Sequence, residues 1–351
     1  MAPAALLPNP VPPMVTGPTT KKATRPTKKL PKSLIEGAKV SYKATFDPKQ
    51  HLAYSPPEKI HKMADFGLDG AGISPNAISE PFPLFTEDAI RQMRAEIFSE
   101  PVLAECQYAS SFCTNMIRGM GHSRAPFIYD VWKHPDVLSK ISDVAGIDLV
   151  PVFDWDIANI NVAVKDDYDE PQTKNNGAVK PVDVDDDNVP AFAWHYDSFP
   201  FVCVVMLSDC TGMIGGETAI RLPWGDVKKV RGPAMGYAVI MQGRYLEHQA
   251  LKALGGRERI TMVTAFRPRD PLVRDESILV GVRGISDLSE LYPQYFEYRM
   301  EVLEERVRAI RKAERAREMA CRPFDVGEAR RWVEEQRGFL DSILAEMFEV
   351  V

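Results

Sequence analysis

Residues 191–209, AFAWHYDSFPFVCVVMLSD, contain two short segments typical of β-strands, separated by Pro200. Successive side chains of a strand leave opposite faces, so residues two positions apart share a face. His195 and Asp197 have this spacing, and we expect both side chains on one face of the first strand. One short strand could therefore direct an imidazole and a carboxylate at the same metal ion.

Short segments with the same period of two occur from residue 150 to residue 270, separated by Gly, Pro and Asp turns. Besides the opening stretch they are WDIANINVAV (155–164), GETAIRLP (216–223), AMGYAVIMQG (234–243) and RITMVTAFRP (259–268). Such a series predicts an antiparallel β-barrel or jelly roll. The polar, acidic stretch at 165–189 lacks the Gly and Glu spacing of an EF-hand, so it is interpreted as a loop, with a lid as its alternative role.

Helices are expected on both sides of this β-rich core. Thr86 is a typical N-cap for a helix within 86–103, and Gly146 is typical of the end of a helix over 135–145. A second His-x-Asp, at His134, precedes that helix and is interpreted as its cap rather than as a metal site. Two C-terminal helices, within 286–350, carry apolar stripes that predict packing against the barrel. The stripes are Tyr292, Phe296, Leu303, Val307 and Ile310, then Trp332, Phe339, Ile343 and Met347.

The length and composition favour a globular protein. A chain of 351 residues with 45% hydrophobic content can bury a large core, and the net charge of -6 argues against a nucleic-acid binder. No apolar stretch approaches the roughly 20 residues that span a bilayer. We therefore expect no membrane partner and a cytoplasmic location. The five cysteines form no C-x-x-C pair, which disfavours a disulfide framework or a cysteine zinc site.

The chain is expected to form one catalytic domain. Residues 1–35, with a basic stretch at 20–32, have the composition of a disordered tail, and 36–80 of an irregular segment. The domain would span 36–350, with its β core at 150–270 and its C-terminal helices at 286–350. The last helix has two further alternative roles, as a wall of the active-site mouth or as a homodimer interface.

A third metal ligand and a carboxylate-binding group follow the His-x-Asp. His248 is the only histidine after Asp197, and it follows the predicted strand 234–243. Two imidazoles and a carboxylate form a facial set of ligands that leaves three metal positions open. Arg259 precedes Thr261 by two residues, and an Arg fork beside a hydroxyl suits the far carboxylate of a keto acid. Arg257 is an alternative for the same role.

The order of these motifs resembles that of the iron(II) and 2-oxoglutarate dependent oxygenases over about residues 155–268. The motifs are His-x-Asp (195–197), GGET (215–218), G-x-x-x-x-H (243–248) and Arg-x-Thr (259–261). The resemblance implies a double-stranded β-helix, a jelly-roll or cupin-like fold with flanking helices. It also implies Fe(II), 2-oxoglutarate and O₂ as cofactor and cosubstrates. The implied iron ligands are His195, Asp197 and His248, and the implied 2-oxoglutarate ligands are Arg259 and Thr261.

Two asparagines share a face of the segment 155–164. If that face points inward, Asn161 would suit the cosubstrate and Asn159 the substrate. A solvent-facing role is the alternative for both.

The flanking segments resemble a group of fungal small-molecule oxygenases. They are AGIDLVP (145–151), DWDIANINV (154–162) and WHYDSFPFVCVVMLSD (194–209). This resemblance implies a small-molecule substrate in secondary metabolism, with an L-valine-like amino acid that is closed to an aziridine, or hydroxylated. Such a substrate needs a cation, for which Arg118 and Arg124 are candidates, and apolar walls. The candidates for the walls are Tyr196, Phe199, Phe201, Ile343 and Phe348.

Three other functions are compatible with parts of the pattern. A peptidyl or protein hydroxylase is an alternative because GGET also resembles a stretch of prolyl hydroxylases. A zinc hydrolase could use the same three metal ligands, although the chain lacks the helical H-E-x-x-H of metalloproteases. A cupin-like binding barrel without enzymatic activity would need the metal ligands but not Arg259.

Overall fold

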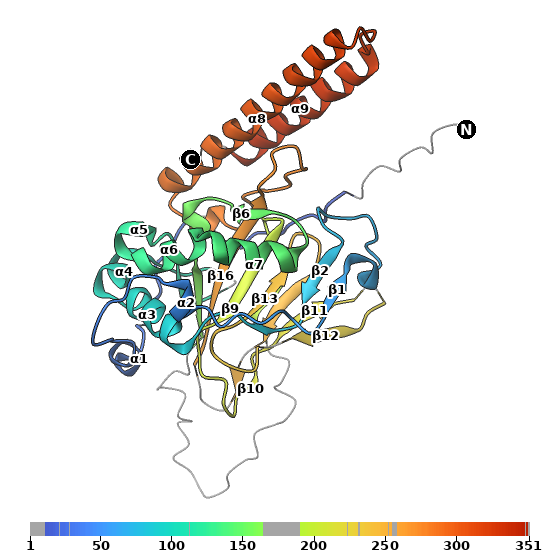
Figure 1. The fold of residues 1–351 in the computed structure, drawn as a ribbon. Coiled ribbons are helices and arrows are strands. Elements are labelled where there is room, and N and C mark those ends of the chain that lie inside the picture. Colours follow the sequence, from blue (N-terminus) through green and yellow to red (C-terminus); the bar gives the residue numbers. More distant parts are fainter. Residues whose placement is uncertain are drawn as a thin grey trace, which may run out of the picture.

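The computed structural model of the chain describes residues 11–163, 190–347 and 349. Within these ranges Lys21, Lys28, Phe112, Pro223, Arg231, Lys252 and residues 255–257 are not described. The described part is mainly β, with antiparallel sheets and flanking helices, as the sequence predicts (Figure 1). Two of the sheets contribute side chains to one cavity between them. The finer prediction, a double-stranded β-helix, stays a prediction.

The larger sheet contains the strand that carries Arg259 and Thr261. Its strand order is β1-β2-β13-β9-β16-β7-β5-β4, with β3 beside β13 and β6 beside β16. The bounds are β1 Ile60–Lys62, β2 Asn76–Ser79, β3 Phe82–Pro83, β4 Gln107–Tyr108, β5 Met116–Ile117, β6 Leu149–Pro151, β7 Asn159–Ala163, β9 Phe201–Met206, β13 Tyr237–Met241 and β16 Arg259–Pro268. Strands β1 and β2 lie in the segment 36–80, so this segment is more regular than expected.

The smaller sheet contains both histidines of the predicted metal site. Its order is β12-β11-β14-β8, and a separate pair joins β10 to β15. The bounds are β8 Pro190–His195, β10 Ile214–Gly215, β11 Thr218–Arg221, β12 Val227–Val230, β14 His248–Leu251 and β15 Ala253–Leu254. Each of the six segments with a period of two therefore contains a strand.

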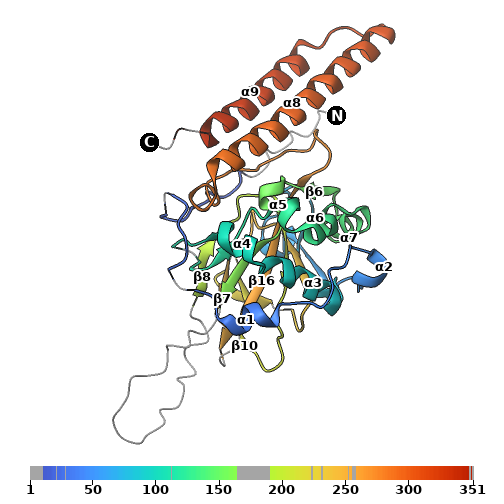
Figure 2. The ribbon, with the colours of Figure 1, turned by 90° about the vertical axis from the view of Figure 1, so that its left-hand side faces the viewer.

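Helices cover the outer face of the larger sheet (Figures 1 and 2). They are α3 Glu87–Ile97, α4 Glu100–Glu105, α5 Gly121–Arg124, α6 Pro126–Lys133 and α7 Pro135–Ala145. The predicted caps are confirmed: Thr86 accepts a hydrogen bond from the Ala89 amide at 3.2 Å, and His134 accepts one from the Asp136 amide at 3.2 Å. Gly146 ends α7 with a φ of 73°.

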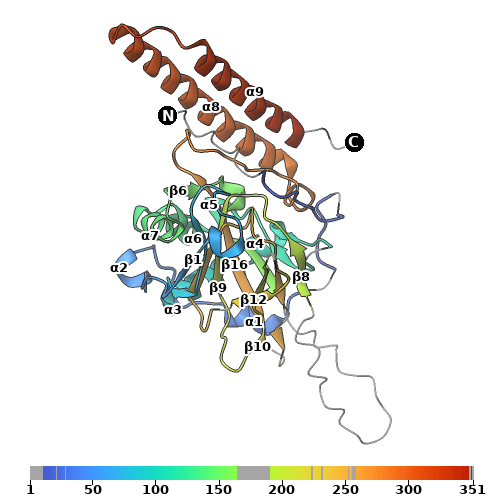
Figure 3. The ribbon, with the colours of Figure 1, turned by 90° about the vertical axis from the view of Figure 1, so that its right-hand side faces the viewer.

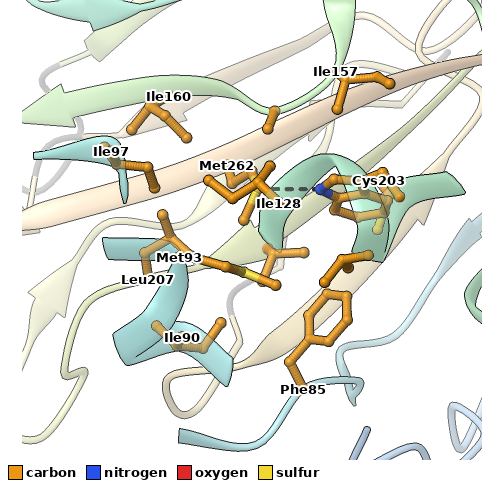
Figure 4. Close-up of a cluster of buried hydrophobic side chains, with 14 of the residues drawn as sticks. Phe85, Ile90, Met93, Ile97, Ile128, Ile157, Ile160, Cys203, Leu207 and Met262 are labelled. Carbon is orange, nitrogen blue, oxygen red and sulfur yellow. Dashed lines mark hydrogen bonds between the residues drawn. The ribbon is translucent and has the colours of Figure 1, made fainter. Parts of the chain in front are cut away.

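Alternation along β16 separates the core from the cavity. Ile260, Met262 and Phe266 are buried in the cluster beneath the helices. Figure 4 shows Met262 in this cluster, near Ile160 of β7 and Ile128 of α6. The alternate residues of β16 line the cavity on the inner face: Arg259, Thr261, Val263 and Ala265. The strand period thus places the polar pair Arg259 and Thr261 on the cavity side.

The C-terminal helices α8 Leu288–Met319 and α9 Val326–Glu346 form a hairpin that projects from the β-sheets (Figure 3). Its base packs on the body through Leu291, Tyr295, Tyr298 and Val302 of α8 and Phe339 and Ile343 of α9.

The predicted α8 stripe is confirmed in part: Tyr292 and Leu303 pack against the body, but Phe296 is 46% exposed and Val307 37% exposed. The predicted and the observed buried residues of α8 both have helical spacing, so periodicity alone could not choose between two adjacent apolar faces.

No helix in the described ranges has both the length and the apolarity needed to cross a membrane. The homodimer through these helices stays a prediction.

Residues 11–35 do not form the disordered tail that their composition predicts. Val15, Leu30 and Leu34 are buried, and Thr24 forms a β-bridge with Ala109. Helices α1 Lys32–Gly37 and α2 Pro48–His51 follow. A few buried apolar side chains among the prolines are enough to hold this extended segment against the body, although its average composition is typical of a disordered tail. Residues 1–10 lie outside the described part.

Candidate metal centre

The side chains of His195, Asp197 and His248 meet at one end of the smaller sheet. One ligand atom from each residue lies within 4.8 Å of those of the others. Asp197 Oδ1 is 3.5 Å from His195 Nε2 and 3.6 Å from His248 Nε2. His195 ends β8 and pairs directly with His248, the first residue of β14. Antiparallel pairing therefore brings together two histidines that are 53 positions apart in the chain.

Both imidazoles are oriented by the backbone. His195 Nδ1 lies 2.8 Å from the Ala193 carbonyl oxygen, and His248 Nδ1 lies 2.9 Å from the Leu246 carbonyl oxygen. A carbonyl oxygen only accepts hydrogen bonds, so each Nδ1 must donate. In a neutral ring the lone pair is then on Nε2, the atom that faces Asp197. This is the arrangement in which a metal-binding histidine is fixed by its second nitrogen.

The charge states of the buried ligands suit a divalent cation. Burial lowers the pKa of His248 to about 4, so its imidazole is neutral at pH 7. Burial raises the pKa of Asp197, but His248 and His195 lower it by more, and the net shift is downward. A neutral imidazole and an ionised carboxylate are the forms that bind metals. Asp197 Oδ2 is buried and has no hydrogen-bond partner among the described residues, so the set fits a bound cation.

Gly243 holds Asp197 in place by close contact. Its carbonyl accepts a hydrogen bond of 2.8 Å from the Asp197 amide. A Cβ built on Gly243 would lie 1.7 Å from Asp197 Oδ2. Only a glycine leaves room for the carboxylate at this point. The sequence signal for this role is the first position of the G-x-x-x-x-H motif.

The cavity beside the ligands has a volume of about 150 Å³ and lies between the two sheets. The predicted residues Asn159, Asn161, Tyr196, Phe199, Arg259 and Thr261 all line it, together with the three candidate metal ligands. Asn159 is 8% exposed, which decides for the inward orientation over the solvent-facing one. Arg118, one of the two candidate cations, lines it as well. Other lining residues were not predicted for the site, and they include Thr16, Asp156, Ser198, Thr218, Gly281 and Ile285.

Arg259 and Thr261 lie at one point of the cavity with Asn161 opposite them. Asn161 of β7 pairs with Thr261 of β16. Arg259 Nε donates a hydrogen bond of 2.9 Å to the carbonyl of Gly216, in the GGET motif. Burial lowers the pKa of Arg259 to about 10, which still leaves the guanidinium protonated at neutral pH. A buried cation beside a hydroxyl and an amide can bind a carboxylate. Arg257 lies outside the described residues, so it stays an alternative.

The last helix, α9, contacts a segment that lines the cavity. Ile343 is buried in the cluster at the base of the hairpin and does not line the cavity, so the wall role predicted for it was wrong. Glu346, three residues later, accepts hydrogen bonds from the Leu279 amide at 2.6 Å and from Arg283 Nη2 at 2.7 Å. The segment 279–285 supplies Gly281, Val282 and Ile285 to the cavity wall. Phe348 lies outside the described residues.

Comparisons with known proteins give low similarity only. No family model matches the chain, and no curated protein matches it. Among solved structures, AviO1 from Streptomyces viridochromogenes Tue57 is 14% identical, with 62% of this chain and 98% of that chain covered and a TM-score of 0.38. The non-heme alpha ketoglutarate dependent epimerase SnoN from nogalamycin biosynthesis is 15% identical (56% and 87% covered, TM-score 0.36). A Pseudomonas putida prolyl-4-hydroxylase is 16% identical (52% and 88% covered, TM-score 0.32). At TM-scores this low the likenesses carry no argument, and function must be inferred from the site.

We predict that Gly243→Ala lowers Fe(II) affinity by at least about 10-fold, because the new methyl group displaces the Asp197 carboxylate. Anaerobic isothermal titration calorimetry with Fe(II) measures this, with circular dichroism as the check on folding. Gly338→Ala is the matched control, because a Cβ at Gly338 meets no atom within 4 Å. Equal Fe(II) affinity in the two variants would contradict the role of Gly243.

Proposed function

We propose that this protein is an iron(II) and 2-oxoglutarate dependent oxygenase, built on a double-stranded β-helix, that acts on a small molecule. One observation carries the proposal: a set of two imidazoles and one carboxylate lines the same cavity as a buried Arg beside a Thr. The first group suits a divalent metal with open positions, and the second suits the far carboxylate of a keto acid. Neither group alone would separate this function from the alternatives.

The chain's own residues would have three tasks. His195, Asp197 and His248 would hold iron, while Arg259, Thr261 and Asn161 would hold and orient 2-oxoglutarate. When bound, iron and 2-oxoglutarate supply the activation of O₂ that allows a hydrogen atom to be removed from an unactivated C–H bond. The apolar wall would exclude water from the reacting groups and hold the substrate carbon near them. This wall includes Phe199, Val202, Val204, Val263 and Ala265.

The alternatives make different demands on the cavity. A zinc hydrolase or a binding barrel could use the three metal ligands but has no need of a buried Arg259 beside Thr261. A peptidyl hydroxylase needs an open groove for an extended chain, whereas the cavity of about 150 Å³ favours a small molecule. The narrower reaction that we propose is closure of an L-valine-like amino acid to an aziridine, with hydroxylation as the alternative outcome. Its support is the resemblance of residues 145–151, 154–162 and 194–209 to fungal small-molecule oxygenases of secondary metabolism.

We predict that purified protein under argon gives a visible charge-transfer band when Fe(II) and then 2-oxoglutarate are added, because the keto acid chelates the metal. The Asp197→Ala variant should lack the band, since it loses a metal ligand. In air, the wild type should convert 2-oxoglutarate to succinate in the presence of substrate. Binding of Fe(II) without the band would refute the oxygenase proposal and favour a hydrolase or a binding barrel.

Arg259→Gln should weaken 2-oxoglutarate binding by roughly 10- to 100-fold and leave Fe(II) binding unchanged, because it removes a charge-assisted hydrogen bond to the far carboxylate. The measurement is a titration of the charge-transfer band with 2-oxoglutarate. Arg267→Gln is the control, since Arg267 is on the same strand but does not line the cavity. An unchanged 2-oxoglutarate affinity in Arg259→Gln would transfer the role to Arg257.

A further inference from the structure

A second group of polar side chains lines the cavity, formed by Arg118, Asp156 and Asn159, which we name the head-group cluster. Arg118 Nη2 and Asn159 Nδ2 each donate a hydrogen bond of 2.7 Å to Asp156 Oδ1. The three residues are buried, with 5%, 1% and 8% of their surface exposed. A buried ion pair is costly unless its remaining polar atoms are also satisfied.

Three atoms of this cluster have no partner among the described residues. They are the donor Arg118 Nε and the acceptors Asp156 Oδ2 and Asn159 Oδ1, all buried. Each buried polar atom without a hydrogen bond costs roughly 1–3 kcal/mol, so such atoms in a cavity wall point to a ligand. The ligand must accept one hydrogen bond from a cation and donate to two oxygens.

The head-group cluster is separate from the proposed 2-oxoglutarate site. Met116 and Ile117 of β5 pair with Asn161 and Ile160 of β7, which brings Arg118 next to Asn159. Asn159 in turn pairs with Val263, four residues along β16 from Arg259. At about 3.3 Å per residue, this places Asn159 about 13 Å from Arg259 along the strands and about 7 Å from Asn161. One keto acid of five carbons has no need of both groups.

We propose that the head-group cluster binds the amino and carboxylate groups of a free α-amino acid, the primary substrate. The substrate carboxylate accepts from Arg118 Nε, and its ammonium donates to Asp156 Oδ2 and Asn159 Oδ1. A zwitterion adds no net charge to a cluster that is itself a neutral ion pair, so it satisfies all three atoms without burying an uncompensated charge. The inference rests on the proposed oxygenase function, and it specifies the residues that hold the substrate head group and the orientation of the substrate.

The surroundings of the cluster favour an aliphatic side chain on this amino acid. Val263 and Ala265 continue the cavity wall along β16, Val202 pairs with Ala265 from the adjacent strand β9, and Phe199 also lines the cavity. The other candidate cation, Arg124, does not line this cavity. It forms an ion pair with Glu105 at the surface and contributes to a different hollow. Arg118 is therefore the arginine that can contact the substrate.

The test is anaerobic calorimetry on the full chain loaded with Fe(II) and 2-oxoglutarate, titrated with each of the twenty standard L-amino acids. L-Valine is compared with isobutylamine, which lacks the carboxylate, and with 3-methylbutanoate, which lacks the amine. We expect each analogue to bind at least about 10-fold more weakly than L-valine, because each leaves one side of the cluster unpaired.

Two variants separate the two ends of the head group. Arg118→Lys keeps the charge that balances Asp156 but removes Nε, so it should weaken L-valine and 3-methylbutanoate by about 10-fold and leave isobutylamine unchanged. Asn159→Ala should weaken the binding of L-valine and isobutylamine and leave that of 3-methylbutanoate unchanged. This variant keeps the test valid if Arg118→Lys fails to fold. Arg124→Lys is the matched control and should bind all three like the wild type.

Two results would overturn the inference: none of the twenty amino acids binds, or L-valine binds equally to the wild type and to the folded cluster variants. In that case the three atoms are satisfied by water only. The charge-transfer band is recorded first, and the amino-acid titration is run whether or not it forms. Loss of the band refutes the oxygenase function, whereas a normal band without amino-acid binding refutes the head-group assignment and the L-valine-like substrate but not the oxygenase function.

Discussion

The pairing of β8 with β14 is the interaction on which the site depends. It sets His195 directly opposite His248, and the chain then turns so that Asp197 lies against Gly243. Backbone carbonyls orient both imidazoles, so the ligands are held before any metal binds. A slip of this register by one residue would turn one histidine to the other face of the sheet and destroy the site.

Burial sets the second constraint, because the cavity holds more charged and polar groups than its walls can pair. Asp197 Oδ2, Arg118 Nε and Asp156 Oδ2 are all buried without a partner in the described part of the chain. In an apolar surrounding such groups cost stability, and they persist where a ligand completes them. A metal ion would satisfy the first, and an amino-acid head group the other two. The hydrogen bonding of the cavity wall would therefore be satisfied only with a metal and a substrate bound.

Sequence reasoning could predict the groups that depend on local periodicity. The period of two placed His195 with Asp197 and Arg259 with Thr261, and capping residues located α3 and α7. The head-group cluster could not be found in this way, because Arg118 reaches Asn159 only through the pairing of β5 with β7. Ile343 was misassigned because helical spacing can show that a residue is buried, but it cannot show which part of the molecule the residue packs against. The packing of Val15 was missed because a composition average conceals single apolar anchors.

The central claim is that one cavity holds a metal and a keto acid at residues that the strand pairing brings together. The most direct test is a crystal structure grown without oxygen in the presence of Fe(II) and 2-oxoglutarate, with anomalous scattering at the iron edge. We expect one iron peak bounded by His195 Nε2, His248 Nε2 and an Asp197 carboxylate oxygen, with the far carboxylate of the keto acid on Arg259. An iron peak away from Asp197, or a keto acid that does not reach Arg259, would contradict it.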